Sequence, residues 1–199
     1  MSLSYRMLDG VLTQEVAEPR SPGHGEILVE VGASSINYRD IAIQAGYYPS
    51  LNGVIPLSDG AGQVVEVGTG VEGLKSGQAV TSCFYPFWES GPALASNHRA
   101  TLGCDLDGML TRFVTLPAQA WVSTPEHMSA AEAATLPCAA LTAWAALFTR
   151  GNLLPGQHVL IQGTGGVAIF ALQFAKAMGA QVTMISSSDH KLARAFELG

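Results

Sequence analysis

The stretch that decides the fold is residues 158–199, HVLIQGTGGVAIFALQFAKAMGAQVTMISSSDHKLARAFELG. It opens with a short apolar run at 158–162 that its residue types predict to be a strand, and a glycine-rich turn then leads into an apolar helix through Met178. Gly179 is expected to end that helix, and a second strand at 181–186 leads to a polar turn and a further helix. Strand, helix and strand in this order predict one βαβ unit.

The turn between the first strand and the helix carries a G-x-G-x-x-A pattern made by Gly163, Gly165 and Ala168. In dinucleotide-binding folds the first glycine permits the tight turn, the second lets backbone approach a pyrophosphate, and the small third residue packs helix against strand. The exposed N–H groups at the helix start attract the pyrophosphate, because the helix dipole favours anions there. We therefore expect the turn to bind a dinucleotide. The candidate binding residues are Gly163, Thr164, Gly165, Gly166 and Val167.

The first part of the chain has a different texture. Short apolar runs such as 26–31 and 63–67 are separated by turns rich in glycine, proline and asparagine. Such a pattern predicts short strands in an irregular barrel or sandwich.

From Ser129 the chain becomes an alanine-rich helix. Ser129 and Glu132 have the spacing of a capping box, and Pro137 is expected to interrupt or kink the helix because it lacks an N–H group. This change of texture divides the sequence into a first domain at 1–120 and a second at 121–199.

The composition excludes several classes of protein. Hydrophobic residues make up 48% of the chain and charged residues 13%, so the chain is not disordered. A net charge of -6 argues against nucleic-acid and anionic-membrane partners, and no apolar run approaches the roughly 18–20 residues that span a bilayer. The three cysteines, Cys83, Cys104 and Cys138, are odd in number and far apart, which fits reduced thiols. No signal-peptide pattern opens the chain, and we expect a cytoplasmic protein.

Four further segments stand out, at 35–40 (SINYRD), 46–49 (GYYP), 56–68 (PLSDGAGQVVEVG) and 133–144 (AATLPCAALTAW). Together with the glycine turn, and in this order, they resemble the medium-chain dehydrogenase/reductase superfamily. Within it the chain is similar to the zinc-independent branch that contains quinone oxidoreductases and their alcohol-dehydrogenase-like relatives.

The resemblance implies an α/β plus β fold. A GroES-like irregular β-barrel domain would be followed by the first half of a Rossmann doubly wound parallel-sheet domain, with the active site in the cleft between the two. It also implies a second Rossmann half and carboxyl-terminal strands beyond Gly199. Without them the far edge of the 158–162 strand would lie open. We expect residues 1–199 either to belong to a longer chain or to pair this edge with another molecule. In both cases the nicotinamide half of the cofactor site is incomplete, so we expect residues 1–199 alone to be inactive. The full-length protein is expected to be a homodimer.

The resemblance also bears on catalytic zinc, which needs about three Cys, His or Glu ligands and an open position. In the zinc-dependent relatives a cysteine stands at the position of Asn37, and a His-Glu pair stands where this chain has Ser58 and Asp59. Only Cys138 keeps a ligand, and one thiol does not hold zinc. We expect no catalytic zinc, and we expect Cys138 to pack as a small hydrophobic residue.

The structural zinc lobe of those relatives needs four closely spaced cysteines. The corresponding stretch, 87–109, offers only His98 and Cys104. A site made by Cys83, His98 and Cys104 is the alternative, but these residues lack short C-x-x-C spacing.

The end of the second strand bears on the choice of nicotinamide cofactor. An NAD-selective site usually carries an acidic residue about 20 residues past the glycine turn. Here Ser186, Ser187 and Ser188 occupy that place, Lys191 and Arg194 follow, and the first acid, Asp189, stands where a helix N-cap is expected. Hydroxyl groups and a cation accept a 2′-phosphate, so Ser186, Ser187 and Lys191 favour NADPH over NADH. The alternative is that the two cations form an ordinary solvated helix face.

Without a metal, the protein itself must offer hydrogen-bond donors to the substrate oxygen that gains charge. The candidates are the Asn37 amide and the phenols of Tyr38 and Tyr48. Asp40 is expected to fix its loop by bonding backbone or Arg39. For Tyr48, simple packing is the alternative.

The expected reaction is transfer of hydride from C4 of NADPH to a quinone, an enone or another activated carbonyl, with a proton from solvent or a tyrosine. Two alternatives remain open: a metal-free alcohol or aldehyde dehydrogenase, and a non-catalytic nucleotide-binding protein.

Overall fold

The computed structural model describes residues 1–88, 90–91, 94 and 100–199. His98 lies outside the described residues. The chain folds into two compact units, Met1–Pro137 and Cys138–Gly199. The division after Pro137 falls later along the chain than the boundary at 120 that the sequence texture indicates.

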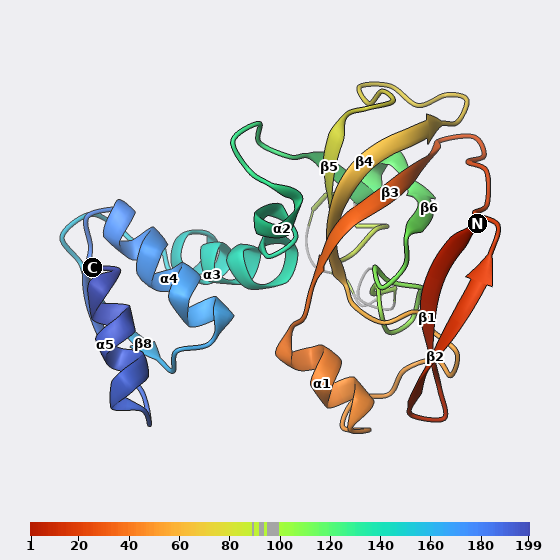
Figure 1. The fold of residues 1–199 in the computed structure, drawn as a ribbon. Helices are drawn as coiled ribbons and strands as arrows, with labels where there is room; N and C mark the ends of the chain where they lie inside the picture. The colour runs from red at the N-terminus through yellow and green to blue at the C-terminus, as the bar shows by residue number, and fades with distance from the viewer. Residues whose placement is uncertain (89, 92–93, 95–99) are drawn as a thin grey trace. The chain divides into compact units, whose positions relative to one another are not determined.

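The first unit is built on a five-stranded antiparallel sheet with the strand order β6-β3-β4-β5-β7 (Figure 1). The strands are β3 (Glu26–Ser35), β4 (Asp59–Val67), β5 (Ala79–Ser82), β6 (Phe113–Pro117) and β7 (Trp121–Ser123). The predicted strands at 26–31 and 63–67 lie within β3 and β4 and are confirmed. Two register shifts between β3 and β4 mark β-bulges, which bend and twist a sheet. In the described residues this sheet is open, with β6 and β7 at its edges.

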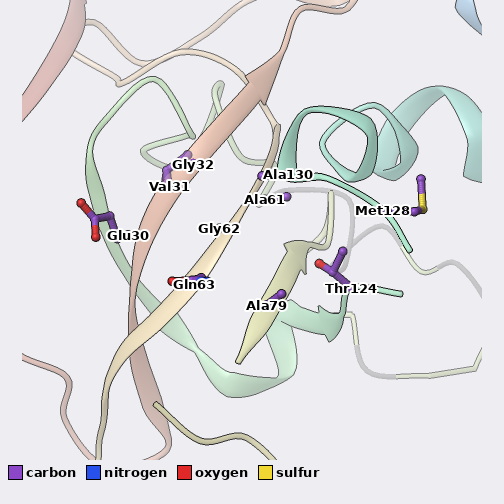
Figure 2. Close-up of a pocket in the computed structure, with 10 residues that line it drawn as sticks. All are labelled: Glu30, Val31, Gly32, Ala61, Gly62, Gln63, Ala79, Thr124, Met128 and Ala130. Carbon is purple, nitrogen blue, oxygen red and sulfur yellow. The ribbon is translucent and has the colours of Figure 1, made fainter. Parts of the chain in front are cut away.

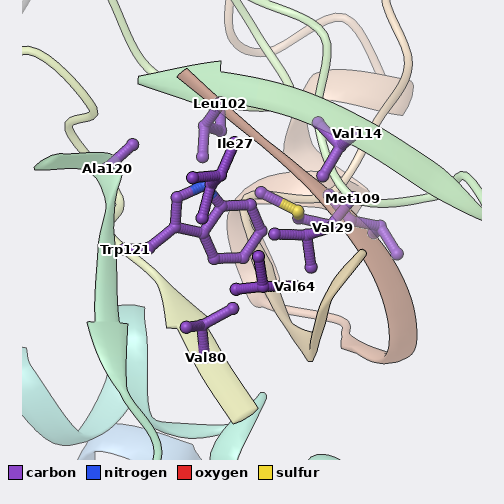
Figure 3. Close-up of a cluster of buried hydrophobic side chains, with 10 residues drawn as sticks. Ile27, Val29, Val64, Val80, Leu102, Met109, Val114, Ala120 and Trp121 are labelled. Carbon is purple, nitrogen blue, oxygen red and sulfur yellow. The ribbon is translucent and has the colours of Figure 1, made fainter. Parts of the chain in front are cut away.

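The core of this unit lies against the sheet and surrounds the indole of Trp121 (Figure 3). Every second residue of a strand points to the same face, so Ile27 and Val29 of β3 enter the core together. Burying each such side chain contributes about 1.5–3 kcal/mol. The remaining buried members are Leu57, Val64, Val80, Leu102, Met109, Val114 and Ala120.

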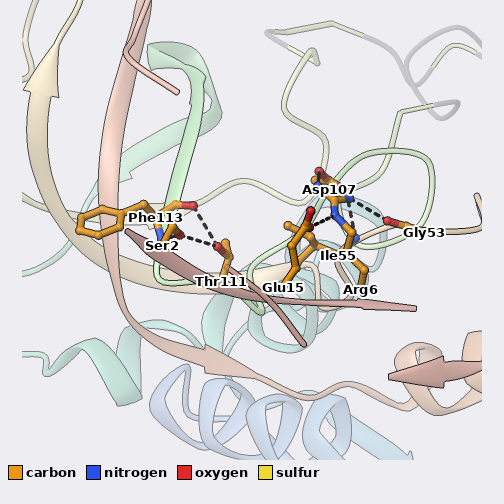
Figure 4. Close-up of polar contacts among 8 residues, drawn as sticks. All are labelled: Ser2, Arg6, Glu15, Gly53, Ile55, Asp107, Thr111 and Phe113. Carbon is orange, nitrogen blue, oxygen red and sulfur yellow. Dashed lines mark hydrogen bonds and ion pairs between the residues drawn. The ribbon is translucent and has the colours of Figure 1, made fainter. Parts of the chain in front are cut away.

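A hairpin of β1 (Ser2–Leu8) and β2 (Val11–Ala17) is bonded to the rest of the first unit through backbone hydrogen bonds and through the side chains of Ser2 and Arg6 (Figure 4). Arg6 donates two hydrogen bonds to the Asp107 carboxylate, at 2.9 and 3.0 Å, and one to the carbonyl oxygen of Gly53 at 2.7 Å. Asp107 also accepts the backbone N–H of Ile55 at 3.0 Å. Through Asp107 and Gly53, Arg6 thus links the hairpin to the loop between α1 (Tyr38–Gln44) and β4, which contains Gly53 and Ile55.

The alanine-rich helix is interrupted as expected. α2 (Ala130–Ala133) begins with the predicted capping box: Ser129 N–H donates to Glu132 at 2.9 Å, and Glu132 N–H donates to the Ser129 hydroxyl at 3.3 Å. A π-helical turn (Leu136–Ala140) contains Pro137, α3 (Leu141–Trp144) follows, and a second π-helical segment (Ala145–Arg150) ends the run. The missing N–H of Pro137 explains the break in the α-helical hydrogen bonds.

The second unit contains the predicted βαβ unit. β8 (His158–Gln162) and β9 (Gln181–Ile185) pair in parallel, α4 (Gly166–Ala177) connects them, and α5 (Asp189–Glu197) follows. Within the described residues β8 has no partner on its other edge, and Leu160 keeps 60% of its surface exposed. Among the helices that the structure describes, none combines the length and apolar character needed to cross a membrane.

Candidate functional site

The glycine turn leaves open space where a ligand can approach the backbone. Gly163 adopts a φ of +86°, which side chains with a Cβ rarely tolerate, and its N–H donates to the Ile185 carbonyl at 2.8 Å. A Cβ built at Gly165 would meet no atom within 4 Å. Gly165 is also the N-cap of α4, and in the described part of the chain no side chain caps it. The first amides of α4 are therefore available to an anion.

Ala168 has the packing role that the sequence pattern assigns to its small third residue. It is buried in the core of the second unit with Ile161 of β8 and Leu172 of α4. Its methyl group lets the helix lie close to the strand, which holds the glycine turn in place.

The end of β9 is connected to the glycine turn through hydroxyl groups. The Thr164 and Ser186 hydroxyls are 3.3 Å apart, and the Ser186 hydroxyl accepts the N–H of Ser188 at 3.3 Å. Ser187 and Lys191 are exposed beside them. The expected position of the helix N-cap was wrong by one residue: Ser188 is the N-cap of α5, and its hydroxyl accepts the Lys191 N–H at 3.4 Å.

Near this turn, Asp189 has another position, and Arg194 another partner, than the sequence predicts. Asp189 becomes the first residue of α5, where a carboxylate is stabilised by the helix dipole. Arg194 forms an ion pair with Glu197 on the same helix. Of the two cations, Lys191 and Arg194, Lys191 therefore remains available to a ligand, because its ammonium group forms no ion pair within the described residues.

In the first unit, the start of α1 (Tyr38–Gln44) holds the candidate oxygen-binding amide. Asn37 is the N-cap, and its backbone N–H donates to the Asp40 carboxylate at 2.7 Å, as expected for an aspartate that fixes this loop. The side-chain nitrogen of Asn37 and Oδ1 of Asp40 are both buried, and neither has a hydrogen-bond partner in the described structure. A buried polar group left in this state costs about 1–3 kcal/mol, so a ligand group or a water that bonds it is stabilised.

Burial raises the pKa of Asp40, and the negative charge of Asp59 raises it further, whereas the Asn37 N–H and Arg39 oppose the change. Asp59 itself is fully buried, and the hydroxyl of Ser58 donates to it at 2.6 Å. At the start of α1, the Asn37 side-chain nitrogen and Asp40 Oδ1 are thus buried polar atoms, where a hydrogen bond is stronger than in water.

The candidate phenols lie at the surface. Tyr38 begins α1 and is 78% exposed, while Tyr48 follows the helix and is 51% exposed. A seven-residue helix is roughly 10 Å long, so the backbones of Asn37 and Tyr48 stand at its opposite ends. Tyr38 is therefore the phenol nearer in sequence and along the helix to the Asn37 amide.

The donors available for a metal are few. In the ranges that the structure describes, no three His, Cys, Asp or Glu side chains gather into a metal-binding group. Burial raises the pKa of the Cys83 and Cys104 thiols, and Cys104 donates to the Pro49 carbonyl at 3.1 Å. The alternative site from Cys83, His98 and Cys104 lies partly outside the described residues.

A pocket of about 430 Å³ lies in the first unit, away from these residues (Figure 2). Small residues of neighbouring strands, Gly32, Ala61 and Gly62, leave room beside the sheet, and Thr124 and Met128 close the space. The close approach of the strands requires the glycine, since a Cβ at Gly62 would lie 2.0 Å from the Glu30 carbonyl oxygen. None of the candidate site residues lines this pocket.

The order of these elements is that of a known family. The family model of the alcohol dehydrogenase GroES-like domain matches residues 23–126, which contain Asn37, the start of α1 and the five-stranded sheet. The chain belongs to this family. It is thereby a member of the medium-chain dehydrogenase/reductase superfamily, which confirms both the resemblance and the fold class.

Two curated relatives illustrate the similarity. The chain is 44% identical to a zinc-type alcohol dehydrogenase-like protein of Schizosaccharomyces pombe, with 96% of this chain and 56% of the relative covered. It is 32% identical to an acryloyl-coenzyme A reductase of Metallosphaera sedula, with 92% and 57% covered. The chain thus spans somewhat more than half the length of these GroES-like relatives.

Solved structures agree with this assignment. A protein from Sinorhizobium meliloti 1021 described as an alcohol dehydrogenase has a TM-score of 0.90 and 41% identity, with 100% of this chain and 60% of that chain covered. A quinone oxidoreductase of Pseudomonas syringae has a TM-score of 0.80 and 27% identity, with 100% and 57% covered.

Sequence reasoning missed two groups near the candidate site. The hydroxyl contact between Thr164 and Ser186 joins residues of two different segments of the βαβ unit. Arg39, expected as a partner of Asp40, instead donates to the Leu102 carbonyl at 3.0 Å and to the Thr101 hydroxyl at 3.3 Å. The one available signal was that Arg39 is the single cation of the helix YRDIAIQ.

Proposed function

We propose that this chain contributes the nucleotide-binding turn and the substrate-binding segment of an NADPH-dependent oxidoreductase. The full-length protein transfers hydride to a quinone, an enone or another activated carbonyl, without catalytic zinc. Membership of the alcohol dehydrogenase GroES-like family, and relatives that are dehydrogenases and reductases by name, support an oxidoreductase.

The observation that carries the proposal is the buried, unpartnered amide nitrogen of Asn37. When hydride reaches the carbon of an activated carbonyl, an electron pair moves onto the oxygen. A preorganised N–H donor in an enclosed site stabilises that charge, and its effect is larger there than in water. The Asn37 amide donates this hydrogen bond, and Tyr38 or solvent then supplies a proton to the oxygen.

NADPH supplies the hydride when it is bound. The α4 amides at Gly166 and Val167 hold the pyrophosphate, and Gly165 leaves room for it. The hydroxyls of Ser186 and Ser187, with the ammonium group of Lys191, accept the 2′-phosphate. The absence of a carboxylate at 186–188 supports this choice, because a carboxylate there would repel the phosphate.

The proposal of a metal-free reaction rests on the chemistry of the donors present. An amide at Asn37, and the Ser58 hydroxyl bonded to the Asp59 carboxylate, replace the thiolate and imidazole ligands that zinc prefers. These residues do not fit a catalytic zinc ion, although the Schizosaccharomyces pombe relative is named a zinc-type protein. The name of that relative also supports an alcohol or aldehyde as the alternative substrate.

We further propose a cytoplasmic location. Its support is the thiol state of Cys83 and Cys104, neither of which forms a disulfide.

The test is substitution of the proposed donor in the full-length protein. Asn37→Ala should lower kcat by about 10²-fold while NADPH affinity stays the same, because the bond forms mainly in the transition state. Asn37→Ser keeps an N-cap residue and should reproduce the loss with a smaller effect on thermal stability. The matched control is Asn52→Ala, which removes an exposed asparagine bonded to Asp9 and should leave kcat unchanged. Equal kcat in wild type and in both Asn37 variants would assign the oxygen to other donors.

A further inference from the structure

Arg39 connects α1 to two distant segments of the first unit. Its guanidinium donates to the Leu102 carbonyl at 3.0 Å and to the Thr101 hydroxyl at 3.3 Å, and it lies 4.5 Å from the centroid of the Phe84 ring. A planar guanidinium can donate sideways to two acceptors while its face rests on an aromatic ring. These contacts direct the side chain into its own unit rather than toward a ligand.

The segment that receives Arg39 is itself fixed. Asp105 accepts both the N–H and the hydroxyl of Thr101, at 3.0 and 2.7 Å, and Asp105 N–H donates back to the Thr101 carbonyl at 3.1 Å. Leu102 is fully buried in the core of the unit. Residues 101–106, called the Thr101 turn below, therefore give Arg39 an anchor that is itself bonded and packed.

The same turn also holds the loop that carries Tyr48. The thiol of Cys104 donates to the Pro49 carbonyl at 3.1 Å, and Leu51 N–H donates to the Cys104 carbonyl at 3.0 Å. Cys104 is buried. The Thr101 turn is thus bonded on one side to α1, next to Asn37, and on the other side to the loop beyond the end of α1.

We propose that Arg39 is a positioning residue: through the Thr101 turn it sets the place of α1, and with it Asn37, relative to the Tyr48 loop. This inference rests on the proposed function for its catalytic consequence. The role requires the two-acceptor fork of arginine, because a lysine ammonium at the same place cannot lie flat on Phe84 and reach both acceptors in one plane.

The experiment measures two quantities in full-length Arg39→Met and Arg39→Lys proteins. The first is the limiting rate at which iodoacetamide alkylates the Cys104 thiolate, taken from a pH profile because Arg39 lowers the pKa of this thiol and its removal alone would slow the reaction at neutral pH. Peptide mass mapping counts Cys83 and Cys138 separately. The second is kcat and KM with NADPH. Loss of the anchor should loosen the turn and speed alkylation of Cys104. It should also lower kcat by up to about 10²-fold, because a catalytic group such as Asn37 that is misplaced by about 1 Å can cost that much. The KM for NADPH should stay unchanged.

Arg39→Lys should show both effects to a smaller degree, and it keeps the test open if Arg39→Met does not fold. Arg20→Met is the matched control, since it removes an exposed arginine that is ion-paired with Glu26 and should change neither quantity. Wild-type alkylation of Cys104 in both Arg39 variants would overturn the anchor whatever the activity. Faster alkylation with unchanged kcat would overturn the positioning role. If Asn37→Ala has no effect while Cys104 alkylation rises in the Arg39 variants, the anchor stands and the proposed function fails.

Discussion

At the scale of single residues, two carboxyl groups respond to opposite forces. Burial raises the pKa of Asp40 above its ordinary value of 3.8, so the folded protein holds this proton more tightly than the unfolded chain does. A hydrogen bond from Arg20, followed by one from the Gly23 N–H, lowers the pKa of Glu26 from 4.5 to about 2. The two groups therefore give opposite contributions to the pH dependence of stability.

For Asp40 the folded state binds more protons, so its contribution to the free energy of unfolding falls as pH rises from 3.8 through the higher folded pKa. For Glu26 the contribution is complete above 4.5 and is lost as pH falls toward about 2. Asp40→Asn should therefore flatten the first slope, and Glu26→Gln should flatten the second. Urea unfolding as a function of pH measures both. A steeper loss at rising pH in Asp40→Asn than in wild type would contradict the assigned direction.

The choice of cofactor also depends on single side chains. Lys191→Ala in the full-length protein should weaken NADPH binding and leave NADH binding nearly unchanged, because only NADPH carries the 2′-phosphate. Arg194→Ala is the control: Arg194 is engaged by Glu197 and should matter less. Fluorescence titration with both cofactors gives the ratio of affinities. A wild-type protein that binds both equally would show that Lys191 belongs to a solvated helix face.

At the scale of elements, the two glycines of the turn allow the effects on cofactor binding and on stability to be measured separately. Gly165 has a φ of -80°, which any residue tolerates, and a Cβ there meets no atom within 4 Å. Gly165→Val should therefore leave the melting temperature close to wild type while weakening NADPH binding, because the side chain occupies the space proposed for the pyrophosphate. Gly163→Val is the contrasting variant: its φ of +86° predicts a loss of stability as well. Full NADPH affinity in Gly165→Val would place the pyrophosphate elsewhere.

Elements set by local pattern were predictable from the sequence. β8, α4 and β9 follow from an apolar run, a glycine turn and a second apolar run, and the capping box at Ser129 and Glu132 follows from spacing alone. The N-cap of α5 was misplaced because Ser188 and Asp189 are both good N-cap residues and only the backbone geometry distinguishes them. The Arg39 anchor joins residues more than 60 positions apart, and no local pattern encodes such a contact.

At the scale of the whole molecule, the chain divides after Pro137, within the π-helical turn that interrupts the alanine-rich helical run. The boundary that the sequence texture indicates, at residue 120, falls earlier, just before β7 and the loop that leads to α2. Composition therefore locates a change of secondary structure, whereas the boundary between compact units depends on which side chains pack together. The relatives are longer than this chain, so we propose catalysis for the full-length protein.

The central claim is hydride transfer from NADPH without zinc, and one measurement tests it directly. Full-length protein is dialysed against a chelator, its zinc content is determined, and oxidation of NADPH by an enone or a quinone is followed in the same sample. We predict undiminished turnover with far less than one zinc ion per chain. Loss of activity on chelation, with recovery when zinc is returned at one ion per chain, would contradict the account.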